Sequence, residues 1–131
     1  MKVVINNGIG SFELSQKAFQ RLIELGMTLT ELDEKGRHVI NPGADIYKIS
    51  WHNFDKRLED GVRYFFVDSH GGNEIRIRSN PLVIKVVEEL GTDAADCCTL
   101  KIIEVPDGTD CYICSDDDGS EWVAERHRTW S

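Results

Sequence analysis

The sequence predicts one α+β domain over residues 1–131, with a mixed or antiparallel sheet and two main helices. Three observations predict this class. The length of 131 residues suits a single domain. Two segments carry both start and stop signals of an α-helix. The strand-like segments do not alternate regularly with these helices, as they would in a doubly wound fold.

The first elements are a strand and a capped helix. Residues 2–6 are rich in β-branched side chains and are typical of a strand, which a glycine-containing turn follows. Ser15 is placed to cap a helix that ends before Gly26. Leu14 and Phe19 are spaced as a hydrophobic staple across that cap. The buried stripe of this helix is expected to contain Ala18, Phe19, Leu22 and Ile23.

The middle of the chain, residues 27–61, has little periodicity. The turn signals EKGR and NPGA precede a short strand-like segment, DIYKI, and NFDKRLED is compatible with a short helical turn. The segments VRYFFVD and EIRIR follow, separated by SHGGN. Their pattern predicts two strands joined by a glycine-containing hairpin loop.

The second helix has the clearest boundaries. Asn80 is placed to cap it, Pro81 suits its first position and Gly91 suits its exit. Its inward face is expected to carry Leu82, Val83, Val86, Val87 and Leu90. Beyond it, TLKIIEV and DCYIC are typical of strands, and PDG and SDDDGS of turns. The tail EWVAERHRTWS fits either a strand or a helix.

The charge and the cysteines restrict the environment and the partners. With 23 acidic against 15 basic side chains, the net charge is −8, so a nucleic acid polymer is not an expected partner. The chain shows no cleavage-site pattern and no apolar run of membrane length, which predicts a cytoplasmic protein without a membrane partner. The 4 cysteines are then expected to be free thiols.

Arg76 and Arg78 are the leading candidates for a binding site. In a strand, residues two apart face the same side, so both guanidinium groups would project together beside the helix start at Asn80. Guanidinium groups suit bidentate contact with phosphate or carboxylate. The alternative is a solvated strand face whose arginines pair with carboxylates across the sheet.

Gly8 and Gly10 offer a second candidate contact for an anion, because glycine lets backbone amides approach a ligand closely. The alternative is a plain turn between strand and helix. The spacing lacks the third glycine of a dinucleotide fingerprint. Arg126, Arg128 and Trp130 suit ring stacking or a subunit contact, although an ordinary packed terminus explains them equally well.

No catalytic residue, metal site or cofactor is predicted. Cys111 and Cys114 have the spacing of zinc ligands, but the Tyr-Ile pair between them favours a strand, which sends the two thiols to opposite faces. The segment SDDDGS lacks the first ligand of a calcium loop and the helix that enters such a loop. A tight turn with solvated aspartates explains it better.

Several segments resemble a group of small, mostly uncharacterised proteins encoded by bacteriophages and prophages. They are MKVVIN, NPLVIKVVEELG, LKIIEVPDG and DGSEWVAERHRTW, together with the helix end IELG. The similarity covers both ends of the chain and the region from about Arg76 onward, and it departs in the middle third. Small acidic phage proteins include homo-oligomers that sequester host nucleotide immune signals.

The resemblance therefore implies a non-enzymatic protein that binds a small anionic ligand, with a nucleotide as one candidate, and that forms a homo-oligomer. Two alternatives stay open at this point. One is an accessory or inhibitor protein that binds a host protein through its acidic surface. The other is a small hydrolase whose site has no recognised pattern.

Overall fold

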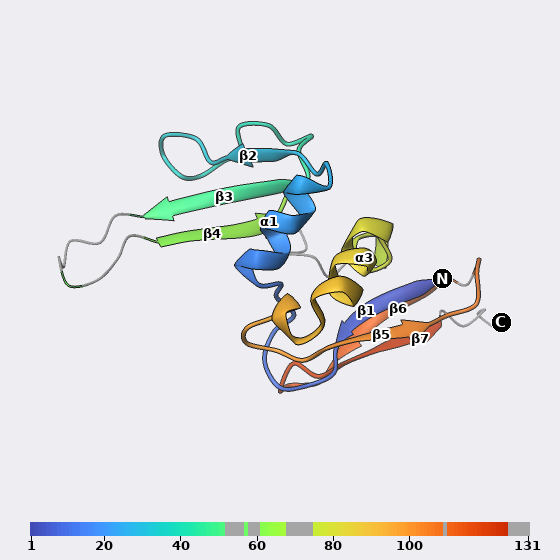
Figure 1. The fold of residues 1–131 in the computed structure, drawn as a ribbon. Coiled ribbons are helices and arrows are strands. Elements are labelled where there is room, and N and C mark those ends of the chain that lie inside the picture. The colour runs from blue at the N-terminus through green and yellow to red at the C-terminus, as the bar shows by residue number, and fades with distance from the viewer. Residues whose placement is uncertain (52–56, 58–60, 68–74, 109, 126–131) are drawn as a thin grey trace, which may run out of the picture.

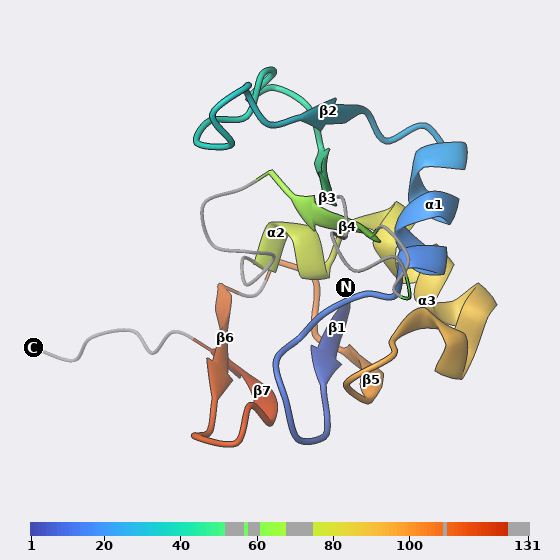
Figure 2. The same cartoon turned by 90° about the vertical axis from the view of Figure 1, so that its left-hand side faces the viewer.

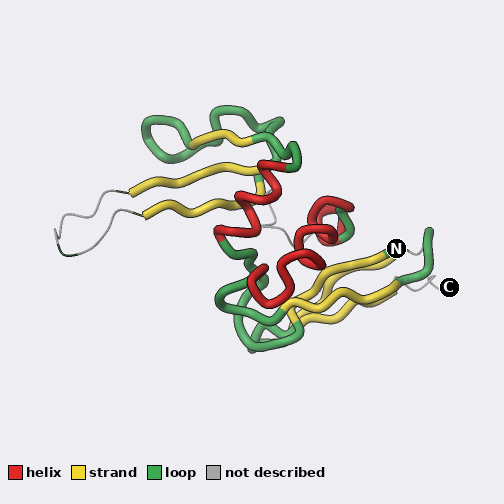
Figure 3. The backbone as a smooth tube through the Cα atoms, viewed as in Figure 1, coloured by secondary structure: helices red, strands yellow, loops and turns green. Residues whose placement is uncertain are grey.

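The computed structural model describes residues 1–51, 57, 61–67, 75–108 and 110–125. In this part of the chain, two groups of strands lie on either side of the helices α1 and α3 (Figure 1). Three small sheets have the orders β2-β3-β4, β1-β5 and β6-β7. The mixture of helices with mixed and antiparallel pairing confirms the predicted α+β class (Figure 3).

Strand β1 (Lys2–Asn6) connects the N-terminal segment to residues 100–104. It pairs antiparallel with β5 (Leu100–Glu104), in a register that sets Val4 opposite Ile102. Both strands are at the predicted places. The side chains of Val3, Val4 and Ile5 are buried, so β1 has apolar contacts on both faces.

Helix α1 (Gln16–Glu24) begins and ends as predicted. The Ser15 hydroxyl accepts a hydrogen bond from the Ala18 N–H at 3.1 Å. Leu14 and Phe19 on either side of this cap are both buried, as a staple requires. Gly26 adopts a φ of 116°, the left-handed region that favours glycine after a helix.

The middle region forms the second sheet, of which the sequence indicated only part. Strand β3 (Ile46–Trp51) pairs antiparallel with β4 (Gly61–Phe66) and parallel with the short strand β2 (Leu29–Glu31). The predictions for DIYKI and VRYFFVD are confirmed, whereas β2 was not predicted. The segment NFDKRLED and the SHGGN loop lie almost wholly outside the described residues.

The prediction that EIRIR forms a strand is wrong. Residues Ile75–Arg78 form a short helix, α2, and the Ile75 carbonyl accepts from the Ser79 N–H at 2.9 Å. The predicted hairpin with β4 therefore does not exist. A helix rotates residues two apart by about 200°, so Arg76 and Arg78 point to different sides. Arg76 is exposed and Arg78 is fully buried.

Helix α3 (Pro81–Leu90) confirms the second capped helix. The Asn80 side chain accepts from the Leu82 N–H at 2.9 Å, and Gly91 has a φ of 57°. Val83, Val86 and Val87 are buried as expected, Leu82 and Leu90 are partly buried, and Ile84 joins the core as well. The short 3-10 helix η1 (Gly91–Ala94) follows, and its Ala94 carbonyl accepts from the Ser15 N–H.

Strands β6 (Cys111–Ser115) and β7 (Glu121–Glu125) form a hairpin around the aspartate-rich turn. The strand alternative for the tail is thus the correct one as far as Glu125. Arg126, Arg128 and Trp130 lie outside the described residues. The hairpin lies beside β1, as Figure 2 shows from a second direction.

Candidate functional site

Arg78 and Glu121 form a buried ion pair at the junction of β1, α2 and β7. The two Arg78–Glu121 hydrogen bonds, Nη1 to Oε1 and Nη2 to Oε2, measure 2.7 and 2.9 Å. The side chains are 0% and 6% exposed. The Phe12 ring covers the guanidinium at 3.4 Å from Cζ to the ring centroid. This arrangement is bidentate and stacked, the geometry for which arginine is best suited.

The pair also closes the open edge of β1. Alternate residues of β1 point their backbone groups toward β5, and the intervening residues point away from it. On the side away from β5, the Val4 carbonyl accepts from Arg78 Nη1 at 3.2 Å. The Asn6 N–H donates to Glu121 Oε1 at 2.8 Å. Two side chains thereby satisfy backbone groups that another strand would satisfy in a wider sheet.

The Asn6 side chain organises the turn that follows β1. Its amide nitrogen donates to the carbonyls of Gly10 and Gly119, at 2.5 and 3.1 Å. Its oxygen accepts from the N–H groups of Gly8 and Thr99, at 3.0 and 3.3 Å. Asn6 is fully buried. In these four bonds, the amide nitrogen makes two donated hydrogen bonds and the amide oxygen accepts two, which is the full capacity of the group.

The amides of Gly8 and Gly10 make internal hydrogen bonds instead of the predicted contact with an anion. The Gly8 N–H donates to Asn6, and the Gly10 N–H donates to the Asp118 carbonyl at 2.8 Å. A β-carbon at Gly8 would crowd the Thr99 side chain and one at Gly10 would approach the Cys97 carbonyl, so both glycines allow close packing in a turn, which agrees with the plain-turn alternative. An anion at these amides would have to displace internal hydrogen bonds.

Arg78 is likewise not the surface anion contact that the sequence analysis expected. The alternative prediction, that Arg78 pairs with a carboxylate, agrees better with the structure, but this pair is buried and not solvated. Glu121 was missed altogether as an important residue. It occurs among other acidic residues after the aspartate-rich turn, and no local pattern distinguishes a buried glutamate from its exposed neighbours.

Arg76 and Asn80, by contrast, come together. They line one pocket of about 420 Å³ between the start of α3 and the segment Pro42–Asp45. Asp45 contributes a carboxylate whose Oδ2 accepts from the Thr28 N–H and hydroxyl, at 2.9 and 3.1 Å. The remaining lining residues are Met27, Phe66, Val67, Ile77 and Val83. The pocket thus combines apolar side chains with groups of both charges, and its volume falls within the range of small-molecule sites.

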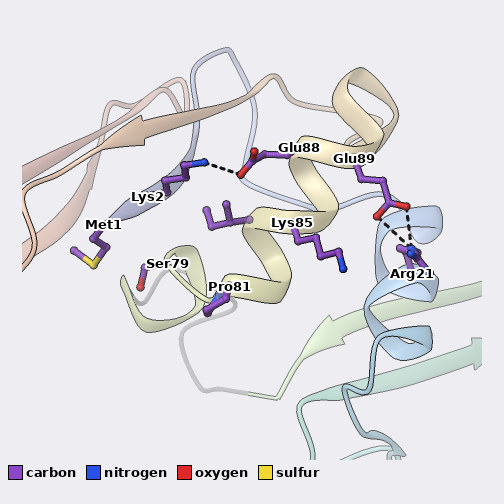
Figure 4. Close-up of a pocket in the computed structure, with 9 residues that line it drawn as sticks. Met1, Lys2, Arg21, Ser79, Pro81, Lys85, Glu88 and Glu89 are labelled. Atoms are coloured by element: carbon purple, nitrogen blue, oxygen red, sulfur yellow. Dashed lines mark hydrogen bonds and ion pairs between the residues drawn. The ribbon is translucent and has the colours of Figure 1, made fainter.

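A larger and more open groove of about 700 Å³ lies beside the outer face of α3 (Figure 4). Its charged groups largely satisfy one another. The Lys2 ammonium lies 3.2 Å from Glu88 Oε1, and Arg21 Nε lies 3.2 Å from Glu89 Oε1. Exposed pairs of this kind join neighbouring elements and contribute little stability. We favour the Arg76 pocket as the candidate site, because a guanidinium group and the amino end of α3 lie together in its lining.

The cysteines do not form a metal site with other described residues. Within the described ranges, no group of three His, Cys, Asp or Glu side chains is placed to hold a metal ion. All four cysteines are free thiols, as expected. Cys111 and Cys114 lie on strand β6, so their spacing of three sends them to opposite faces.

Comparison with protein-family models, curated proteins and solved structures finds no match for this chain. The resemblance to phage proteins therefore stays a prediction. Among the residues that the structure covers, no helix combines the length and apolarity needed to cross a membrane.

The buried ion pair predicts that replacing Arg78 destabilises the protein far more than replacing Arg76. Arg78→Met should lower the free energy of unfolding by about 3–5 kcal/mol, because it leaves the Glu121 charge buried without its partner. Arg76→Met is the matched control, and its exposed position should limit the loss to about 1 kcal/mol or less. Urea denaturation followed by circular dichroism measures both. Equal losses would contradict a structural role that is specific to Arg78.

The close contact between Gly119 and Gly10 predicts that two glycine substitutions differ in how much they destabilise the protein. Gly119 has a φ of 92°, and a β-carbon there would overlap the Gly10 backbone. Gly108 has a φ of 78° with open space around it. Gly119→Ala should therefore destabilise the protein by clearly more than Gly108→Ala, whose cost is the backbone strain of roughly 1 kcal/mol. Thermal unfolding of both variants tests this, and similar melting temperatures would argue against the close approach.

The thiols should differ in reactivity. Burial raises the pKa of Cys98 and of Cys111, so less of the reactive thiolate is present near neutral pH. Cys97 is exposed. Iodoacetamide at neutral pH, followed over time by peptide mass spectrometry, should label Cys97 first and Cys111 last. Raising the pH should accelerate labelling of Cys98 and Cys111, and simultaneous labelling of all cysteines would contradict the buried placement.

Proposed function

We propose that this protein binds a small anionic ligand in the Arg76 pocket and acts by binding rather than by catalysis. The observation that carries the proposal is the position of Arg76 in one pocket with Asn80 and the first turn of α3. A guanidinium group offers paired donors to a phosphate or carboxylate. The amino end of a helix adds a favourable dipole for the same charge.

The size and the other lining groups restrict the ligand further. A pocket of about 420 Å³ lies in the lower part of the range for small-molecule sites and is too small for a polymer. Asp45 in the lining opposes a ligand that is anionic throughout. A ligand with an anionic group near Arg76 and a hydrogen-bond donor near Asp45 satisfies both, and a nucleotide has this combination.

The biological role that we propose rests on the resemblance to phage proteins. In that role, a homo-oligomer in the cytoplasm of the host cell would sequester a nucleotide immune signal without consuming it. No cofactor is needed for such a function. Sequestration requires only tight binding and enough copies of the protein, so the Arg76 pocket is sufficient in principle.

The test begins with the ligand itself. Protein purified from cells is denatured, and the released small molecules are identified by mass spectrometry. Ligand-free protein is then screened by thermal shift against inorganic phosphate and a panel of mono-, di- and cyclic nucleotides. Stabilisation by at least one anionic compound is expected. If no compound is released and none stabilises the protein, the proposal fails. Chemical conversion of the bound compound would instead favour the hydrolase alternative.

Arg76→Ala localises the site. Loss of a charged hydrogen bond to the ligand should weaken binding by roughly tenfold to a hundredfold. Lys101→Ala is the control, because it removes an exposed positive charge on β5, outside the residues that line the pocket. Calorimetric titration of the compound found in the screen measures both variants. An affinity that Arg76→Ala leaves unchanged would exclude this pocket as the site.

A further inference from the structure

The outer face of the β6–β7 hairpin carries an aromatic surface that the proposed function does not use. In the register of the two strands, Tyr112 lies opposite Ala124 and Cys114 lies opposite Trp122. Side chains of directly paired residues share one face, so these four lie together. Glu121 points from the other face into the ion pair with Arg78. The aromatic face is therefore directed away from β1.

Both aromatic side chains on this face are well exposed. Tyr112 is 40% exposed and Trp122 is 46% exposed. The other large exposed apolar residues of the described chain are aliphatic, with Ile9 and Ile40 in loops and Leu29 on β2. Tyr and Trp are the residues most enriched where proteins bind one another. We define Tyr112, Cys114, Trp122 and Ala124 as the hairpin face.

Three exposed aspartates, Asp116, Asp117 and Asp118, follow directly at one end of the hairpin face. The turn that holds them is well defined. The Asp116 N–H donates to the Ser120 carbonyl at 2.8 Å, and the Gly10 N–H donates to the Asp118 carbonyl. Asp116 is only two residues from Cys114, which is about 7 Å along a strand. A cationic side chain at Trp122 is thus within reach of these carboxylates.

We propose that the hairpin face and its aspartate turn form a docking surface for a basic segment of a partner protein, rich in arginine or lysine. Aromatic ring faces attract cations, and nearby carboxylates complete the recognition. The net charge of −8 favours the approach of such a segment over a distance. A second copy of this chain would instead bring two aspartate turns to one interface, which like-charge repulsion disfavours.

The small area of the hairpin face predicts a weak, transient contact whose strength depends on salt. An oligo-arginine peptide labelled with a fluorophore is a suitable probe, and anisotropy at low salt measures its affinity. Trp122→Ser should weaken binding by about threefold to thirtyfold, the range expected for a lost cation–π contact. Trp122→Phe should restore most of the affinity. Ile40→Ser, at another exposed apolar position, is the control and should have no effect.

General attraction to an acidic protein has to be separated from a specific surface. The double variant Asp116→Asn, Asp117→Asn should weaken binding clearly more than Glu31→Gln, Glu34→Gln, which changes the net charge equally near β2. Equal weakening by the two double variants, or no effect of Trp122→Ser, would overturn the proposal. Absence of binding by the unmodified protein at low salt would overturn it as well. Arg76→Ala should leave this binding unchanged, so the outcome does not depend on the proposed ligand site.

Discussion

The buried pair of Arg78 and Glu121 determines how the rest of the structure is arranged. It lies where β1, α2 and β7 meet, and it connects the backbone of β1 to side chains from two other elements. Because Arg78 has to reach Val4 and Glu121 at once, α2 is oriented with this residue inward. That orientation turns Arg76 outward and places it beside Asn80 at the start of α3. The candidate ligand pocket is thus an indirect consequence of the ion pair.

A buried ion pair is not in itself a source of stability, because the desolvation of two charges offsets much of their attraction. Here the pair has a second task that apolar side chains cannot perform. The Val4 carbonyl and the Asn6 N–H lie on the edge of β1 that pairs with no other described strand, and they would each lose a partner if both charged residues were replaced. Burying the two charges is costly, but the buried pair holds the edge of β1 in a single arrangement.

The sequence predicted those parts of the fold that local interactions determine. Ser15 and Asn80 cap their helices through contacts within three residues, so α1 and α3 were recognisable from their own segments. The same holds for the strands β5 and β6, whose composition is unambiguous. Loop geometry such as the use of the Gly8 and Gly10 amides depends on Asn6 and on the distant 116–119 turn, and composition alone does not reveal it.

The segment EIRIR shows why the site was predicted only in part. Alternating isoleucine and arginine satisfies the pattern of a strand, yet it also satisfies a single helical turn, and the difference depends on Glu121, which lies 43 residues after Arg78. A pattern within five residues contains no information about that partner. Hence the sequence correctly brought Arg76 next to Asn80 but wrongly placed Arg78 with them.

The pairing of β1 has a consequence for synthesis of the chain on the ribosome. This strand emerges before its partner β5, which begins at Leu100, and before the carboxylate that closes its other edge, which belongs to residue 121. The apolar strand therefore has both edges unsatisfied until residue 121 has been translated. Such late pairing slows folding and prolongs the period in which a nascent strand can associate with other chains. Helix α1, whose cap is local, is the first element able to form and to cover part of that strand.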